Sequence, residues 1–312
     1  GMGLRILDIS DPAAPVELGL CGAPEAAYRV AVAADYAYVA DLESGLYIIH
    51  VANIAPPALA GAYAPLSEAH GVALAGGTAY VADMGGGLHI VEAGDPVTLA
   101  ERGALDTPGF AWGVALMGHY AYVADGPAGL RIVDVTTPST PSEVGFSDLP
   151  GWAYDVAIAG RYAYVADGYA GLRVVDVLTP SAPAEVGYYE TPDWAMDVAL
   201  AGHYLYRADL GQGLRIVDIA TPTAPAEVGY CDTPGYALGV TLAGHYAYVS
   251  DGRSGLRIID VNVPSAPTEV GFYDTTGSAE DVAVVGHYAY VADRRSGLRV
   301  IAVGNPQQPV EV

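Results

Sequence analysis

The residues best suited to bind a ligand share one place in a sequence cycle that repeats every 42 residues. Large aromatic side chains fill the positions four and two residues before a recurrent valine: Phe110, Trp112, Trp152, Tyr154, Trp194 and Tyr236. Aromatic rings offer flat apolar area, which a concave site for a small ligand, a peptide or a sugar requires. We therefore predict a ligand-binding surface built from these rings.

Charged side chains stand directly before the same valine in four copies of the cycle: Arg29, Asp155, Asp197 and Asp281. A few fixed donors and acceptors beside aromatic rings orient a bound ligand, so we predict these residues as its polar anchors. For each aromatic residue taken singly, the alternative is that its ring fills a gap in the protein interior.

A different chemistry is suggested by Glu68, His70 and His89. Carboxylate and imidazole groups are common zinc ligands, so a metal-binding protein or a metal-assisted enzyme is the second hypothesis. His89 is expected on a different strand, away from the channel, which favours chance divergence over a metal site. No cofactor is predicted.

Signatures of catalysis are absent from the sequence. It contains no Gly-x-Ser-x-Gly elbow, no His-Glu-x-x-His, no phosphate-binding loop and no Cys-x-x-Cys pair. The sequence therefore favours a non-catalytic binding or scaffold protein whose partner is a protein, a peptide or a small ligand. Glycan binding by the aromatic residues is a third, weaker hypothesis.

The elements that must position these residues are repeated strands. An aspartate ends one strand of each copy at a constant spacing of 42 residues: Asp41, Asp83, Asp125, Asp167, Asp209, Asp251 and Asp293. In the copy spanning 148–189, alternating residue size predicts strands over 153–159, 162–166, 172–177 and 184–188. Tight turns join these strands into a four-stranded antiparallel meander. Both faces of such a sheet are apolar, so neighbouring sheets must cover them.

A closed ring of sheets leaves no long apolar edge, which predicts an all-β fold, a seven-bladed β-propeller forming one domain. The chain holds seven copies of the first two strands but eight of the last two. We therefore expect the chain ends to mix in sealing the ring, with a half-blade left over for an outside contact or self-association. An eight-bladed ring with one incomplete blade is the alternative.

The predicted boundaries follow from the same cycle. Gly1-Met2 is interpreted as an expression remnant, and the propeller domain is expected over 3–312. Its units are a half-blade followed by seven repeats: 3–23, 24–65, 66–107, 108–149, 150–191, 192–233, 234–275 and 276–312.

Two recurrent charged positions are interpreted as structural. The aspartate that ends the second strand is expected to accept backbone N–H groups from its own turn. An arginine six residues later, as in Arg131 and Arg173, is expected to contact a carboxylate across the same hairpin or on the next blade.

Charge and cysteine content limit the partners. The chain has 36 acidic and 13 basic residues and a net charge of -23, which repels phosphate backbones and anionic lipid, so nucleic acid is not an expected partner. No apolar stretch approaches the roughly 20 residues that span a bilayer, so no membrane insertion is expected. Cys21 and Cys231 lie in equivalent places of separate repeats and are predicted to be free thiols.

One phrase recurs along the chain with small changes. It reads GLRIVDV at 129–135, GLRVVDV at 171–177, GLRIVDI at 213–219 and GLRIIDV at 255–261, each preceded by YVAD or a close variant and followed by Pro-x-x-Pro. These phrases resemble those of the LVIVD-repeat family of bacterial and archaeal β-propellers. The resemblance implies a propeller fold and an extracellular or cell-surface location, and it implies no particular chemistry.

Overall fold

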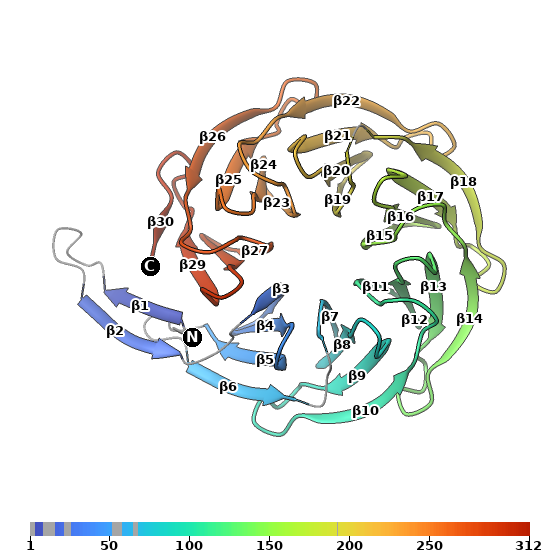
Figure 1. Ribbon diagram of the computed structural model, residues 1–312, viewed down its shortest axis with the longest axis horizontal. Helices are drawn as coiled ribbons and strands as arrows, with labels where there is room; N and C mark the ends of the chain where they lie inside the picture. Colours follow the sequence, from blue (N-terminus) through green and yellow to red (C-terminus); the bar gives the residue numbers. More distant parts are fainter. Residues whose placement is uncertain (1–3, 9–15, 22–25, 52–57, 65–67, 192) are drawn as a thin grey trace.

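Seven four-stranded antiparallel sheets stand around a central axis in chain order, and a two-stranded sheet lies outside them (Figure 1). The computed structural model describes residues 4–8, 16–21, 26–51, 58–64, 68–191 and 193–312. The fold is therefore a seven-bladed β-propeller, as the repeat length predicts.

The outside sheet consists of β1 (Leu4–Asp8) and β2 (Val16–Cys21). The strands of the first four blades are β3 (Ala27–Ala33), β4 (Tyr36–Asp41), β5 (Gly45–His50) and β6 (Ala58–Tyr63); β7 (Gly71–Ala75), β8 (Thr78–Ala82), β9 (Leu88–Glu92) and β10 (Ala100–Leu105); β11 (Gly113–Met117), β12 (Tyr120–Ala124), β13 (Leu130–Asp134) and β14 (Ser142–Ser147); and β15 (Asp155–Ala159), β16 (Tyr162–Ala166), β17 (Leu172–Asp176) and β18 (Ala184–Tyr189). The strands of the last three blades are β19 (Asp197–Ala201), β20 (Tyr204–Ala208), β21 (Leu214–Asp218) and β22 (Ala226–Cys231); β23 (Gly239–Ala243), β24 (Tyr246–Ser250), β25 (Leu256–Asp260) and β26 (Thr268–Tyr273); and β27 (Asp281–Val285), β28 (Tyr288–Ala292), β29 (Leu298–Ala302) and β30 (Val310–Glu311).

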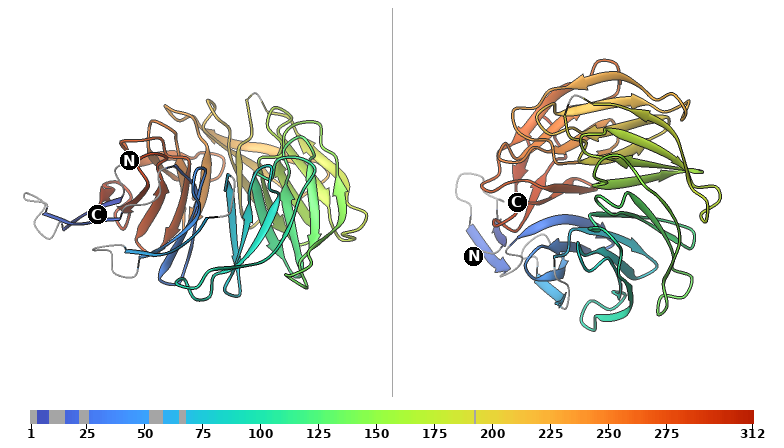
Figure 2. Two further views of the ribbon diagram at one scale, coloured as in Figure 1. Left: turned by 60° about the horizontal axis from the view of Figure 1, so that its bottom comes forward. Right: turned by 45° about the vertical axis from the view of Figure 1, so that its right-hand side comes forward.

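The first strand of each blade lies nearest the central axis and the fourth lies on the circumference (Figures 1 and 2). We call the face that carries the connection into each first strand, together with the turn between strands two and three, the upper face. Isolated backbone bridges join these two segments in neighbouring blades, as between Gly126 and Ala153 and between Gly168 and Ala195. The upper-face loops are therefore tied together around the ring.

The core consists of layers between neighbouring blades. Between the fourth and fifth blades, Tyr164, Leu172 and Val174 pack with Val198 and Leu205, all of them buried. Equivalent clusters join the other neighbouring pairs, including the last blade and the first. Because each sheet is covered by its neighbours, the ring needs no separate core.

The predicted mixing of the chain ends is wrong. All four strands of the seventh blade, β27 to β30, come from the C-terminal segment. Among the described strands β1 pairs with β2 alone, outside the ring, near the place where the last blade meets the first (Figure 1). The ring closes by packing and by a backbone bridge between Ala27 and Arg294. A half-blade is left over as expected, and its role in self-association stays a prediction.

The aspartate after the second strand is structural, but its partner differs from the predicted one. The carboxylates of Asp125, Asp167, Asp251 and Asp293 accept the backbone N–H of a glycine 16 residues earlier, in the connection leading into the blade's first strand. Asp41 also accepts an N–H from its own turn, that of Glu43. The aspartate therefore fastens two upper-face loops to each other.

The recurrent arginine pairs with carboxylates of its own blade. Arg173 lies 3.7 Å from Asp167 and 3.2 Å from Glu185, and its guanidinium lies over the ring of Tyr188 at 4.9 Å. Arg131, Arg215 and Arg257 make the same kind of stacking contact on Phe146, Tyr230 and Phe272. The exposed aromatic rings of the circumference are therefore partly covered by arginine.

Neighbouring blades also approach closely at one glycine in the fourth strand of each of the first six blades. A Cβ atom added to Gly187 would lie 2.2 Å from the backbone oxygen of Pro222 in the next blade. We expect Gly187→Ala to lower the free energy of unfolding by about 1–3 kcal/mol, because the blades must shift apart. Chemical denaturation measures the change. Gly85→Ala is the control, since a Cβ there meets no atom within 4 Å, and equal stability of both variants would contradict this packing role.

Two further predictions concern the thiols and the membrane. Cys231 is a free cysteine, as predicted, whereas the side chain of Cys21 lies outside the described residues. Within the described ranges, no helix is long and apolar enough to cross a membrane.

Candidate functional site

The outermost layer of the channel mouth is an arc of aromatic side chains on the upper face. Phe110, Trp152, Trp194 and Tyr236 come from the same position of four consecutive blades and are 41, 36, 40 and 64% exposed, respectively. The rings of Phe110 and Trp152 are stacked, with centroids 6.2 Å apart. We call these four residues the aromatic arc.

Sequence analysis missed a fifth exposed ring beside the arc. Tyr169, in the turn between β16 and β17, is 56% exposed and meets the edge of Trp194 at a centroid distance of 6.2 Å. The signal was available in the repeat: Tyr169 stands where other blades have Glu43, Pro127 or Arg253.

A second layer fills the channel beneath the arc. It contains one residue from each blade: Tyr28, His70, Trp112, Tyr154, Met196, Leu238 and Glu280. Tyr28, His70, Trp112 and Tyr154 form a chain of touching rings, with centroid distances of 4.3, 4.5 and 5.0 Å. Trp112 and Tyr154 therefore act mainly as filling, and we call this layer the plug.

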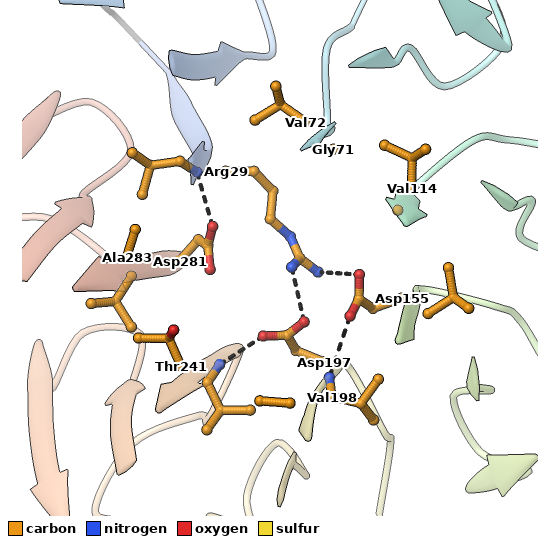
Figure 3. A pocket seen from close by; sticks show the side chains of 16 residues that line it. Arg29, Gly71, Val72, Val114, Asp155, Asp197, Val198, Thr241, Asp281 and Ala283 are labelled. Atoms are coloured by element: carbon orange, nitrogen blue, oxygen red, sulfur yellow. Dashed lines mark hydrogen bonds and ion pairs between the residues drawn. The ribbon is translucent and has the colours of Figure 1, made fainter. Parts of the chain in front are cut away.

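A third layer lies inside the tunnel, where Arg29 reaches across to carboxylates of other blades (Figure 3). Its guanidinium lies 2.8 Å from Asp197 and 3.6 Å from Asp155. Asp281 faces the same cavity of 310 Å³ and accepts the backbone N–H of Val30 at 2.9 Å. We call Arg29, Asp155, Asp197 and Asp281 the tunnel cluster.

The tunnel carboxylates also join neighbouring blades through the backbone. Asp155 accepts the N–H of Val198 at 3.4 Å, and Asp197 accepts the N–H of Val240 at 2.7 Å. These N–H groups belong to the innermost strands, which have no further strand to pair with, so a carboxylate acceptor supplies the missing partner. Asp155 and Asp197 are therefore each held by Arg29 and by a backbone N–H of the next blade.

Burial and charge shift the protonation of the tunnel cluster. Burial, followed by the neighbouring Asp197, raises the pKa of Asp155 well above its ordinary value. Burial also raises the pKa of Asp281 to about 6, although Arg29 opposes the change. Burial alone would lower the pKa of Arg29, but Asp197, Asp155 and Asp281 raise it. Three carboxyl groups thus share one permanently positive partner.

The residues predicted as one site therefore lie at three depths. The cavity that Arg29 lines together with residues of the plug has a volume of only 10 Å³, about the least room that one water molecule needs. The aromatic arc remains accessible, whereas the tunnel cluster lies beneath the plug. We accordingly interpret Arg29, Asp155, Asp197 and Asp281 as a cross-tunnel clamp and no longer as anchors for a ligand on the arc.

The three residues of the metal hypothesis make separate contacts. His70 lies between the rings of Tyr28 and Trp112, and burial lowers its pKa to about 4. His89 lies 3.5 Å from Asp83 and 3.5 Å from Glu101, in the place of the recurrent arginine, while Glu68 is exposed. Over the described part of the chain, no three His, Cys, Asp or Glu side chains are grouped to hold a metal ion.

Seven four-stranded blades around a plugged tunnel define the class of this protein as a seven-bladed β-propeller. The LVIVD repeat model matches eight segments that together span almost the whole chain: 1–22, 25–64, 67–107, 108–148, 150–191, 194–233, 234–275 and 276–312. The chain therefore belongs to the LVIVD repeat family, as its repeated phrase indicates. No curated protein matches it.

Solved structures of similar fold have little sequence in common with the chain. The computationally designed Ika8 protein has a TM-score of 0.69 at 7% identity, covering 93% of this chain and 87% of that one. The propeller domain of Cps50 (Swd1) from Myceliophteria thermophila has a TM-score of 0.72 at 11% identity, with coverages of 90% and 98%. The RRP9 WD40 repeats have a TM-score of 0.72 at 12% identity, with 88% of each chain covered.

Proposed function

We propose that this propeller is a non-catalytic recognition protein that binds a protein or peptide partner on the upper face. The observation that carries the proposal is the aromatic arc, in which four consecutive blades present an exposed ring at the same position. Aromatic residues are enriched where proteins meet and contribute much of the binding energy there. The circumference also exposes rings, but those lie against arginine side chains.

The support beneath the arc favours tight recognition. The plug and the tunnel cluster bind several blades to one another, and the bridges between loops hold the arc at a fixed spacing. A surface that is ordered before binding loses little conformational entropy when a partner binds. From the family resemblance we also infer an extracellular or cell-surface location, which fractionation of native cells would test.

A peptide selected from a random display library against the native protein provides the probe. We expect Trp152→Ala combined with Trp194→Ala to weaken binding about 1,000-fold, since two aromatic anchors cost about 2 kcal/mol each. Both side chains are partly exposed, so the variant should keep its melting temperature. Binding is measured by calorimetry.

The control variant is Phe272→Ala, which removes a half-exposed ring of the circumference. We expect it to bind the selected peptide like the native protein. Unchanged affinity of the folded double variant, or equal losses in the double variant and the control, would rule out the aromatic arc as the recognition surface.

A further inference from the structure

A cavity of 540 Å³ opens beside Tyr236, at the end of the aromatic arc. It lies among the upper-face loops of the fifth, sixth and seventh blades. Leu210, Leu238 and the ring of Tyr236 supply apolar walls, and the charged side chains on its wall are Arg253, Glu280 and Arg294. A pocket with an apolar wall and a few fixed charges is the usual form of a specific ligand site.

The charge of this pocket is opposite to that of the protein. The whole chain carries -23 charges and contains 13 basic residues, all of them arginine. Among the arginines whose side chains are described, ten form an ion pair, leaving Arg253 and Arg295. Arg253 lines the cavity, and no carboxylate of the described residues forms an ion pair with it.

Arg294 is held in a demanding conformation beside it. Its φ is 43°, in the left-handed region where the equivalent positions of three other blades have Gly126, Gly168 and Gly252. For a residue other than glycine this backbone conformation is unfavourable. Glu280, whose side chain is 3% exposed, forms an ion pair with Arg294, whose Nε lies 2.5 Å away, and accepts a hydrogen bond from the Ser278 hydroxyl at 2.9 Å. The terminal nitrogens of Arg294 have no hydrogen-bond partner among the described residues.

The charged side chains of the pocket wall, two arginines and one glutamate, have a net charge of +1. Two guanidinium groups face one carboxylate, so the pocket is balanced by a single negative charge and poorly matched to a polyanion, which the rest of the protein repels. Arginine binds carboxylates through paired N–H groups in a fixed plane. The neighbouring ring of Tyr236 would cover a flat or apolar group attached to that carboxylate.

We propose that this cavity, the arginine pocket, binds one carboxylate of a partner peptide next to an aromatic or apolar residue of that peptide. The proposal rests on the proposed function and deepens it: the aromatic arc binds the apolar side chains of the partner, and the arginine pocket fixes its end or its register. The carboxylate comes either from a free C-terminus or from an acidic side chain.

Small probes test the pocket without a known partner. N-acetylphenylalanine carries a C-terminal carboxylate, N-acetylphenylalaninamide is its neutral match, and an acetylated Phe-Glu amide carries the carboxylate on a side chain. Titrations followed by NMR or by tryptophan fluorescence are informative, because two of the three tryptophans belong to the aromatic arc and the third to the plug beneath it. We expect at least one carboxylate probe to bind about tenfold more tightly than the neutral amide, and the stronger of the two identifies the source.

Two variants and one control assign the effect to the pocket. Arg253→Gln and Arg294→Gly should each remove the preference for the carboxylate, and the second introduces the residue that three other blades have at this position. Arg295→Gln is the control: it lies on the same turn, is exposed and does not line the pocket, so it should keep the preference. Equal binding of charged and neutral probes, or a preference that survives Arg253→Gln, would overturn the proposal.

Failure of this inference and failure of the proposed function give different results. If the carboxylate preference is present but the variant lacking Trp152 and Trp194 still binds the selected peptide, the pocket stands and the arc is wrong. If that variant loses the peptide but no probe prefers the pocket, the arc stands and the pocket is wrong.

Discussion

Replacing Arg29 by methionine is expected to lower the free energy of unfolding by about 3–5 kcal/mol at pH 8, the range found when one partner of a buried ion pair is removed. Arg29 is the single cation among three buried carboxyl groups, and its contacts with Asp155 and Asp197 join the first blade to the fourth and fifth. Methionine keeps the length and apolar contacts of the side chain but not its charge. Chemical denaturation at constant pH measures the loss.

The stability lost on replacing Arg29 should increase as the pH rises. The pKa values of Asp155 and Asp281 are raised in the folded protein. The stability that these two groups contribute is therefore fully present below the unfolded pKa of about 4. It is lost as pH rises through the folded pKa, which is about 6 for Asp281. Without Arg29 these pKa values rise further, so the variant should lose more stability at pH 8 than at pH 5. Arg295→Met serves as the surface control.

An equal loss at both pH values would contradict the assignment of Arg29 to the tunnel cluster. A stability unchanged at pH 8 would contradict the clamp altogether and return Arg29 to the role of a ligand anchor. Adding Asp197→Asn to Arg29→Met should recover part of the loss, because one of the uncompensated charges is removed.

The fifth blade is expected to become more stable when two of its unusual residues are exchanged together. Arg207 is fully buried where the other six blades have valine, and it lies 3.1 Å from buried Asp209. Within the described part of the chain, its Nε and Nη1 atoms and the Oδ1 atom of Asp209 have no hydrogen-bond partner. Asp193 stands where Gly109, Gly151, Gly235 and Gly277 each give an N–H to the aspartate 16 residues later.

We expect Asp193→Gly with Arg207→Val to raise the free energy of unfolding by about 1–3 kcal/mol, since an apolar side chain replaces a poorly satisfied buried ion pair. Arg207→Val alone should destabilise, because Asp209 then lacks both the arginine and the glycine N–H. Denaturation of the two single variants and the double variant forms a thermodynamic cycle. Additive effects would contradict the coupling between Asp193, Arg207 and Asp209.

The repeat length was sufficient to predict the fold, because a meander with two apolar faces is stable only between neighbours. How the ring closes could not be read from the repeats. The segments 3–21 and 297–312 have the same pattern, so either could complete the last blade. The short turn from β28 to β29 favours the local pairing, because closing a short loop costs less entropy than joining the chain ends.

The sequence predicted that the residues of the candidate site lie around the channel, but it did not predict how deep in the tunnel each of them lies. Trp152, Tyr154 and Asp155 are four, two and one residues before the same valine, and they belong to the aromatic arc, the plug and the tunnel cluster, respectively. Their depth depends on how far each first strand extends into the tunnel, which the spacing does not contain. A ligand-binding role for the arc stays a prediction.

The arginine pocket and Arg207 were visible as departures from the repeat and were missed. Arg294 replaces a glycine after the turn aspartate, and Arg207 replaces a valine inside the second strand. Comparing the copies at every position, including the strands and the turns on the upper face, would have singled out both residues. Their partners Glu280 and Asp209 depend on packing between loops and needed the structure.

Hydrogen–deuterium exchange with the peptide selected from the display library tests recognition by the upper face most directly. We predict slower exchange on binding in four segments, 108–112, 150–154, 193–196 and 234–238, which carry the aromatic arc. The outer strands β18 (Ala184–Tyr189) and β22 (Ala226–Cys231) should be unchanged. Protection confined to the outer strands, or to the turns on the opposite face, would contradict the account.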